Sequence, residues 1–307
     1  MSENFADRLA QAVRRCGNAV LVGLDPRWEQ LPTVIRDDGP ASLEQQAKAY
    51  LIFCKGIIDV VAPLVPAVKP QAAFFEQLGP HGMMALAEVI HHARSRGLLV
   101  ILDGKRNDIG TTATAYAEGF LRRGESGGWN ADALTVSPYL GDDSLTPFVE
   151  TCRTNGAGIF VLVKTSNPGG KTFQDLICDG QPLYRHVARH VESLSAETVG
   201  ECGYGAVGAV VGATYPAQLA ELRAVMPHTW FLVPGYGAQG GSATDVAPAF
   251  DAQGLGAIVN NSRGIIFAHA RKEFAHIKPE RWQEAVEAAT REMIEQLAAV
   301  SPSKPAR

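Results

Sequence analysis

The stretch LLVILDGKRND, Leu98–Asp108, passes from an apolar run directly into a cluster of charged side chains. Its first part, Leu98–Asp103, is apolar on both faces, which is typical of a strand buried between two layers of a parallel sheet. Its second part, Asp103–Asp108, holds two aspartates, a lysine and an arginine. We therefore expect a buried strand that ends in a charged site.

Seven further apolar runs occur along the chain, and longer amphipathic or polar stretches separate them. The eight predicted strands are Ala19–Leu24, Ala67–Gln71, Leu98–Asp103, Ala131–Val136, Gly158–Lys164, Val207–Gly212, Trp230–Val233 and Ala257–Asn260. The clearest predicted helices are Leu43–Val61, Gly82–Arg96, Thr112–Arg123, Pro182–Val199 and Pro216–Val225. This alternation predicts an α/β fold, a (β/α)8 TIM barrel, with a doubly wound open sheet as the alternative.

A helix is expected at the C-terminal end of the barrel. Pro279 suits a first helical turn, and apolar residues recur every three or four positions, at Trp282, Val286, Ala289, Met293 and Leu297. No linker divides the chain, so we expect one domain over residues 1–300 and a disordered tail over 301–307. Three loops are expected to be insertions or lids: Gly124–Asn130, Ser166–Gly180 and Gly235–Thr244.

Composition and charge exclude several classes of protein. The 307 residues carry a formal net charge of −4, without the basic footprint of a nucleic-acid binder. The five cysteines form no CxxC pair, which argues against structural zinc and a disulfide framework and for thiols in a reducing cytoplasm. The first residues do not resemble a signal peptide, and no apolar stretch is long enough to span a membrane.

Ionisable and polar residues gather where the predicted strands end, which is where an α/β barrel carries its active site. Side chains two apart on a strand share a face, so Asp103 and Lys105 are expected to point together into the barrel mouth. Lys69 ends the neighbouring strand, and Asp108 lies in the following turn. Carboxylates on both sides favour the ammonium form of Lys105, a proton donor rather than a Schiff-base nucleophile. The alternative is an ion-pair network that only holds two strands together.

A glycine-rich segment, Gly235–Gly240, matches GxGxxG but follows the seventh predicted strand instead of opening a first βαβ unit. Barrels bind phosphate in the loops after strands 7 and 8, and Arg263 would add a bidentate contact there. The alternative is a tight turn beside a solvated arginine. We expect no metal site, because His186 and His190 lack the glutamate of HExxH, and no nucleophilic elbow at Ser137.

The segment DGKRNDIGTTATAY resembles the DxKxxD signature of the orotidine 5′-phosphate decarboxylase family. Other motifs fit the family in the same order: GLDP, VKPQAAFFEQLG, LVKTSN, PGYGAQGG and NNSRGI. The resemblance covers roughly residues 18–270 and is closest to the longer bacterial form. It implies a TIM barrel that converts orotidine 5′-monophosphate to UMP, in the last step of de novo pyrimidine nucleotide synthesis, without a cofactor.

The resemblance also implies a role for each matching residue. Lys105 would protonate C6 after carbon dioxide leaves, Asp103 would lie against the substrate carboxylate, and Lys69 would link Asp103 to the ribose. Asp25 would bind the ribose, Ser166 the pyrimidine edge, and Gln239 with Arg263 the phosphate. Gly235 and Ser262 are expected as further substrate-binding residues. Asp108 and Thr112 would reach the site of a partner subunit, so a homodimer with shared active sites is expected.

Three other functions stay open at this point. A metal-dependent decarboxylase or synthase acting on keto-sugar phosphates would share DxKxxD. A catalytically silent barrel would bind a phosphoribosyl ligand without turnover, and a Schiff-base aldolase would form an imine on a lysine. For the decarboxylase we also expect Ser166–Gly180 and Gly235–Gly241 to close over the substrate.

Overall fold

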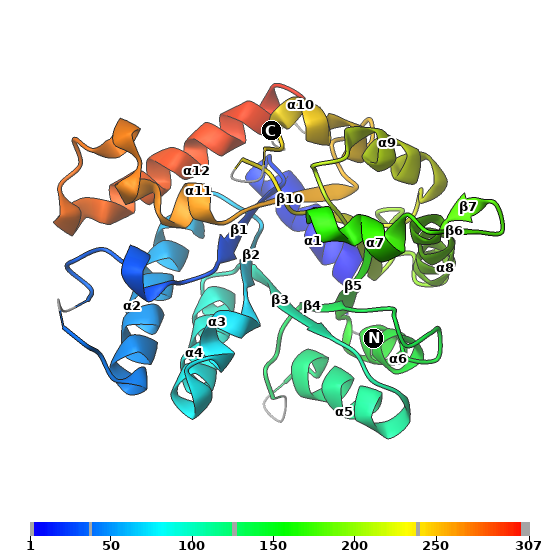
Figure 1. Ribbon diagram of the computed structural model, residues 1–307, viewed down its shortest axis with the longest axis horizontal. Helices are drawn as coiled ribbons and strands as arrows, with labels where there is room; N and C mark the ends of the chain where they lie inside the picture. Colours follow the sequence, from blue (N-terminus) through cyan, green and yellow to red (C-terminus); the bar gives the residue numbers. More distant parts are fainter. Residues whose placement is uncertain (1–2, 37–38, 125–127, 238–239, 302–307) are drawn as a thin grey trace.

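Eight parallel strands close into a barrel in the computed structural model, which describes residues 3–36, 39–124, 128–237 and 240–301 (Figure 1). The strands follow one another around the barrel in chain order, and the last pairs with the first. They are β1 (Val20–Leu24), β2 (Ala67–Pro70), β3 (Leu99–Arg106), β4 (Ala133–Val136), β5 (Gly158–Lys164), β8 (Val207–Val211), β9 (Phe231–Val233) and β10 (Ala257–Asn261). The predicted TIM barrel is confirmed.

Helices surround the barrel in Figure 1. Those of eight residues or more are α1 (Phe5–Cys16), α2 (Leu43–Val61), α4 (Gly79–Ser95), α5 (Gly110–Leu121), α6 (Thr146–Asn155), α8 (Leu183–Ala196), α9 (Pro216–Val225) and α12 (Trp282–Ala298). The short ones are α3 (Ala72–Glu76), α7 (Lys171–Gln174), α10 (Ala243–Val246) and α11 (Arg263–Ile266). The predicted C-terminal helix is α12, and Pro279 lies in the 3-10 turn before it. The predicted tail, 301–307, lies outside the described residues except for Ser301.

The strands are buried on both faces, as their sequence indicates. Every residue of β1, β2, β4, β8 and β9 is buried. Apolar side chains fill these positions with two exceptions toward the ends of strands, Lys69 in β2 and Thr135 in β4. Both exceptions lie in the site described below.

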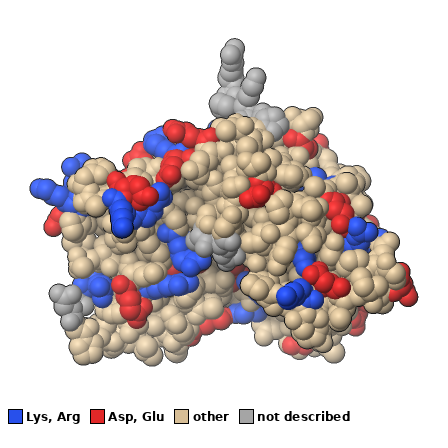
Figure 2. Space-filling model, turned by 45° about the horizontal axis from the view of Figure 1, so that its top comes forward, with Lys and Arg blue, Asp and Glu red and all other residues tan. Residues whose placement is uncertain are grey.

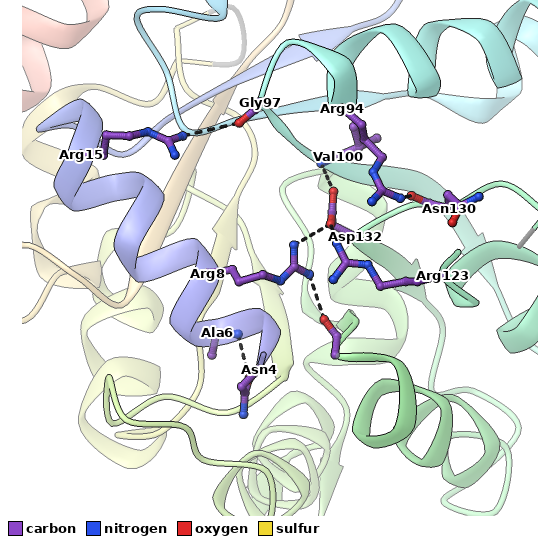
Figure 3. A network of polar contacts seen from close by, with 11 residues as sticks. Asn4, Ala6, Arg8, Arg15, Arg94, Gly97, Val100, Arg123, Asn130 and Asp132 are labelled. Atoms are coloured by element: carbon purple, nitrogen blue, oxygen red, sulfur yellow. Dashed lines mark hydrogen bonds and ion pairs between the residues drawn. The ribbon is translucent and has the colours of Figure 1, made fainter. Parts of the chain in front are cut away.

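Helix α1 covers the end of the barrel at which the strands begin (Figure 1). The Phe5 ring packs so closely on β5 that a Cβ at Gly158 would lie 2.2 Å from it. Arg8 of α1 and Arg123 donate to the buried carboxylate of Asp132 over 2.7 and 2.6 Å, and Asp132 also accepts the Val100 amide (Figure 3). This network holds α1 against the end of the barrel where the strands begin. The open end is therefore the one where the strands finish.

The structure differs from the predicted elements at one strand end, one helix and one loop. Strand β3 runs on to Arg106, beyond the predicted end at Asp103, because a bulge with Lys105 at φ 46° lets Arg106 pair with Val136. Helix α6 was not predicted, since its short apolar set is interrupted by polar residues. The predicted loop Ser166–Gly180 contains a 3-10 turn, α7 and the first strand of a hairpin, β6 (Ile177–Cys178) with β7 (Gln181–Pro182).

The face of the molecule in Figure 2 carries basic and acidic side chains together. On the face in Figure 2, the described lysines and arginines are interspersed with acids and form no broad basic surface. Among the described residues, no helix is both long and apolar enough to cross a membrane. All five cysteines are unpaired.

Candidate active site

A cavity of about 260 Å³ opens at the end of the barrel where the strands finish. Its charged and polar lining comprises Asp25, Lys69, Gln71, Asp103, Lys105, Thr135, Thr165, Ser166, Asn167 and Asn260. Five residues of the predicted site are among them: Asp25, Lys69, Asp103, Lys105 and Ser166. The structure therefore brings together, from separate strands, the side chains that the sequence placed at strand ends.

The carboxylate of Asp103 is the centre of this site. Lys69 Nζ donates to Asp103 Oδ2 over 2.8 Å, and Lys105 Nζ donates to Asp103 Oδ1 over 2.7 Å. Gln71 and Thr135 each donate a further hydrogen bond to Asp103, over 3.0 and 2.8 Å. Four donors thus hold a carboxylate that is only 8% exposed as a residue.

Burial and neighbouring charges shift the pKa values of Asp103 and Lys69 in opposite directions, and the charges have the larger effect. Burial raises the pKa of Asp103, but the ammonium groups of Lys69 and Lys105 outweigh it and hold that pKa well below its usual range. Burial likewise lowers the pKa of Lys69, but the carboxylates of Asp103 and Asp25 raise it above its usual value. Asp103 is therefore an anion and Lys69 a cation near neutral pH.

The two lysines differ in their access to solvent. The Lys69 side chain is 4% exposed and the Lys105 side chain 48% exposed. Lys69 is thus a fixed buried cation, whereas Lys105 can exchange a proton with water.

Asp25 presents an unfilled acceptor at the same cavity. Its Oδ1 atom is buried and has no hydrogen-bond partner among the described residues. A buried polar atom without a partner is costly, so a ligand donor such as a sugar hydroxyl would satisfy it.

The backbone of Ser166 is fixed tightly at the rim. A Cβ at Gly212 would lie 2.8 Å from Ser166 Cα, so only glycine permits this approach of the residue after β8 to the segment after β5. Thr214 also donates to the Ser166 carbonyl over 3.2 Å. These contacts hold Ser166 at the edge of the cavity.

A smaller cavity of about 80 Å³ continues from the first, with which it shares Asp25, Pro234 and Asn260. It extends to Gly235, Tyr236, Asn261, Ser262 and Arg263 in the segments after β9 and within and after β10. Gly235 has φ 94°, Arg263 is exposed, and the buried Ser262 Oγ atom has no partner among the described residues. This part of the site offers hydrogen-bond donors and a guanidinium next to the main cavity.

Three residues of the predicted site are not placed in either cavity. Asp108 is half-buried, and its Oδ1 accepts from the Ile109 amide; it forms no ion pair with the described part of the chain. Four charged residues were expected around one spot. A single chain brings three of them together, Lys69, Asp103 and Lys105, and leaves Asp108 apart. Thr112 is exposed on α5, and Gln239 lies outside the described residues.

Five polar residues that line the main cavity were not among the predicted site residues: Gln71, Thr135, Thr165, Asn167 and Asn260. Gln71 lies two residues after Lys69 and could have been found by the same spacing that linked Asp103 to Lys105. Thr135 and Asn260 are single polar residues in otherwise apolar runs, which is a weaker signal. In the described part of the chain, no three His, Cys, Asp or Glu side chains are grouped as metal ligands.

The chain is similar to known proteins over most of its length. The model of the Orotidine 5′-phosphate decarboxylase / HUMPS family matches residues 20–276. A Rhodopirellula baltica protein named orotidine 5′-phosphate decarboxylase is 60% identical over 297 residues, covering 95% of this chain and 98% of that protein. One of the same name from Deinococcus radiodurans is 45% identical over 270 residues, covering 87% and 91%.

A solved structure shares the fold over nearly its whole length. The Leishmania donovani OMP decarboxylase has a TM-score of 0.74 and 36% identity, and the match covers 97% of this chain and 98% of that one.

Proposed function

Because the chain belongs to the Orotidine 5′-phosphate decarboxylase / HUMPS family, we propose that it converts orotidine 5′-monophosphate to UMP and carbon dioxide. It is thus a carboxy-lyase of pyrimidine nucleotide synthesis. The observation that carries the proposal is the buried Asp103 carboxylate held between the ammonium groups of Lys69 and Lys105 at the barrel mouth.

Fixed charge supplies the catalysis in this proposal. The bond between C6 and the carboxylate breaks, and its electron pair stays on C6 as carbon dioxide leaves. Asp103 lies against the substrate carboxylate, so repulsion between the two anions is relieved as neutral carbon dioxide forms. The Lys105 ammonium stabilises the negative charge that develops on C6, and because it is already positioned it needs no reorganisation.

Lys105 then completes the reaction as a proton donor. A proton moves from Lys105 Nζ to C6, which yields UMP and a neutral amine. The amine regains a proton from water, which its half-exposed side chain can reach. Asp103 stays ionised throughout.

The remaining residues bind the unreactive parts of the substrate. Asp25, whose buried Oδ1 lacks a partner in the described chain, and Lys69 bind the ribose hydroxyls. Ser166 contacts the pyrimidine edge at the rim. The phosphate occupies the smaller cavity, bound by Gly235, Ser262 and Arg263, where a bidentate guanidinium suits it. Gln239, which lies outside the described residues, is proposed for the same role from the family motif alone.

We further propose a homodimer in which Asp108 and Thr112 complete the partner's site. Ile109, Tyr139 and Leu140, in the segments after β3 and β4, are 54%, 83% and 52% exposed. These two segments are linked, since Asn107 donates to Ser144 over 3.1 Å. Exposed apolar side chains grouped in this way mark protein interfaces, and a second copy would cover them next to Asp108.

A cytoplasmic location is also proposed, supported by the five unpaired cysteines.

The test is the ultraviolet absorbance of orotidine 5′-monophosphate incubated with the EDTA-treated protein. Conversion to UMP without added metal is the expected result. A reaction that starts only when magnesium is added would favour the metal-dependent relatives. Binding without any turnover, with or without magnesium, would favour a silent barrel.

A further inference from the structure

We propose that Thr135 is a positioning residue for the proton transfer, whose hydroxyl fixes Lys105 relative to Asp103. This inference rests on the proposed decarboxylase function and deepens it, because it names a residue that acts through the proton donor.

Thr135 lies in β4, is 2% exposed and lines the main cavity. Its Oγ1 atom accepts a hydrogen bond from the Lys105 backbone amide over 2.9 Å and donates one to Asp103 Oδ1 over 2.8 Å. The same Asp103 Oδ1 accepts from Lys105 Nζ over 2.7 Å. The hydroxyl, the carboxylate and the two ends of Lys105 thus form a closed ring.

The direction of each hydrogen bond in the ring is fixed by chemistry. An ionised carboxylate only accepts, and a backbone amide only donates. A hydroxyl can do both at once, so it is suited to stand between the Asp103 carboxylate and the Lys105 amide. An apolar side chain of the same shape would leave the buried part of the ring incomplete.

The backbone at Lys105 needs such a partner. The pairing of β3 with β4 skips from Leu102 to Arg106, and Lys105 lies within this bulge at φ 46°. A bulged residue loses its regular partner on the neighbouring strand. The Thr135 side chain, which comes from that strand, replaces the missing acceptor.

Loss of this anchor would act on the catalytic step more than on binding. The half-exposed Lys105 side chain has a long flexible stem. The position of its ammonium group is therefore well defined only if the Lys105 backbone and the Asp103 carboxylate are both held in place. A misplacement of about 1 Å in a reacting group can reduce a rate about 100-fold. Among the described residues assigned to the ribose and phosphate, none forms a hydrogen bond with Thr135.

The experiment compares Thr135→Val, which keeps the shape, with Thr135→Ser, which keeps the hydroxyl. Thr229→Val is the matched control, because Thr229 is fully buried and donates to the Glu192 carboxylate over 2.7 Å outside the cavities. We expect kcat to fall about 10- to 100-fold in Thr135→Val, with KM and the Kd of UMP within about threefold of the wild type. Thr135→Ser and Thr229→Val should both retain kcat within about threefold.

An unchanged kcat in Thr135→Val would overturn the inference. So would an equal loss in Thr229→Val, or a weakening of UMP binding as large as the loss of kcat, because each would indicate a general effect on the fold. If Thr135→Val does not fold, a comparison of Thr135→Ala with Thr135→Ser repeats the test of the hydroxyl. Equal kcat values in these two variants would overturn the inference. Failure of the wild type to convert orotidine 5′-monophosphate would instead refute the proposed function, and the inference with it.

Discussion

Asp103 accepts hydrogen bonds from four side chains that belong to three different strands or their ends. The sequence predicted two of these partners, Lys69 and Lys105, from charge and from the spacing of two along a strand. It did not predict Gln71 or Thr135. Gln71 could have been inferred from its spacing of two from Lys69. Thr135 is a neutral side chain in an apolar run and gives no charge signal, so only the pairing of strands shows that it reaches the carboxylate.

The pH dependence of stability should report the state of Asp103. Its pKa in the unfolded chain is about 3.9, and in the folded protein burial is outweighed by Lys69 and Lys105, so the pKa is lower. A lowered folded pKa stabilises the protein above the unfolded value, and this contribution is lost as the pH falls through the folded value. We expect the free energy of unfolding of the wild type, minus that of Asp103→Asn, to be constant above about pH 5 and to decrease below about pH 4.

Urea unfolding of both proteins between about pH 3 and pH 7 measures this difference. A difference that stays constant, or increases, as the pH falls would contradict the prediction.

At the scale of elements, the segment after β5 shows the largest departure from expectation. Lys164 is fully buried at the end of β5, pairs with Asp175 next to α7, and lies 5.3 and 4.9 Å from the ring centres of Tyr184 and Tyr215. Gln174 adds two hydrogen bonds to Thr165. These contacts order a segment whose composition indicated a loop, and they lie beside Ser166.

Asp175→Asn should loosen this segment, because it leaves the Lys164 ammonium buried without a carboxylate. Removing one partner of a fully buried pair costs about 3–5 kcal/mol, but the Asp175 side chain is 41% exposed. We therefore expect a loss of about 1–3 kcal/mol in the free energy of unfolding, measured with urea. Asp179→Asn, an exposed position in the same segment, is the control and should change it by less than about 0.5 kcal/mol. Equal effects of the two substitutions would show that the ion pair does not hold the segment.

At the scale of the whole molecule, the two ends of the barrel have different tasks. One end is closed by α1 and by the network around Asp132 (Figure 3). The other end holds the cavities. Charge at the closed end serves stability, and charge at the open end serves the reaction. Stability and activity should therefore respond separately to substitutions at the two ends.

Asp132→Ala tests this separation. It leaves the Arg8 and Arg123 side chains, 14% and 23% exposed, without their carboxylate. We expect the free energy of unfolding to fall by about 3–5 kcal/mol, with kcat and KM unchanged in the folded protein. The control is Asp59→Ala, which removes a half-exposed partner of His92 and Arg96 and should cost about 0–1 kcal/mol. A large change in kcat for Asp132→Ala would refute the separation of the two ends.

Mixed dimers test the proposed sharing of sites. Lys105→Ala and Asp108→Ala should each be inactive alone. A mixed dimer should regain activity, because one of its two sites then combines an intact Lys105 with an intact Asp108 from the other subunit. Equal amounts of the two variants would be assayed after subunit exchange is demonstrated. No recovery of activity would show that each chain uses its own Asp108.

The sequence by itself determined the architecture and the charged centre of the site. Apolar runs buried on both faces repeat eight times, and this pattern suits strands enclosed by helices. Asp103 and Lys105 share a face because side chains alternate along a strand, and Lys69 follows from its place at the neighbouring strand end. These features are local in the chain, so local periodicity and chemistry reveal them.

Only the tertiary structure decided the rest. The bulge at Lys105, the contacts of Thr135 and Gln71 with Asp103, and the Lys164–Asp175 pair each join residues from different segments. Their existence depends on which backbones lie side by side in the closed barrel and on how closely they approach. Spacing along the chain does not record those distances, because the energy of such a contact is realised only when the barrel has closed.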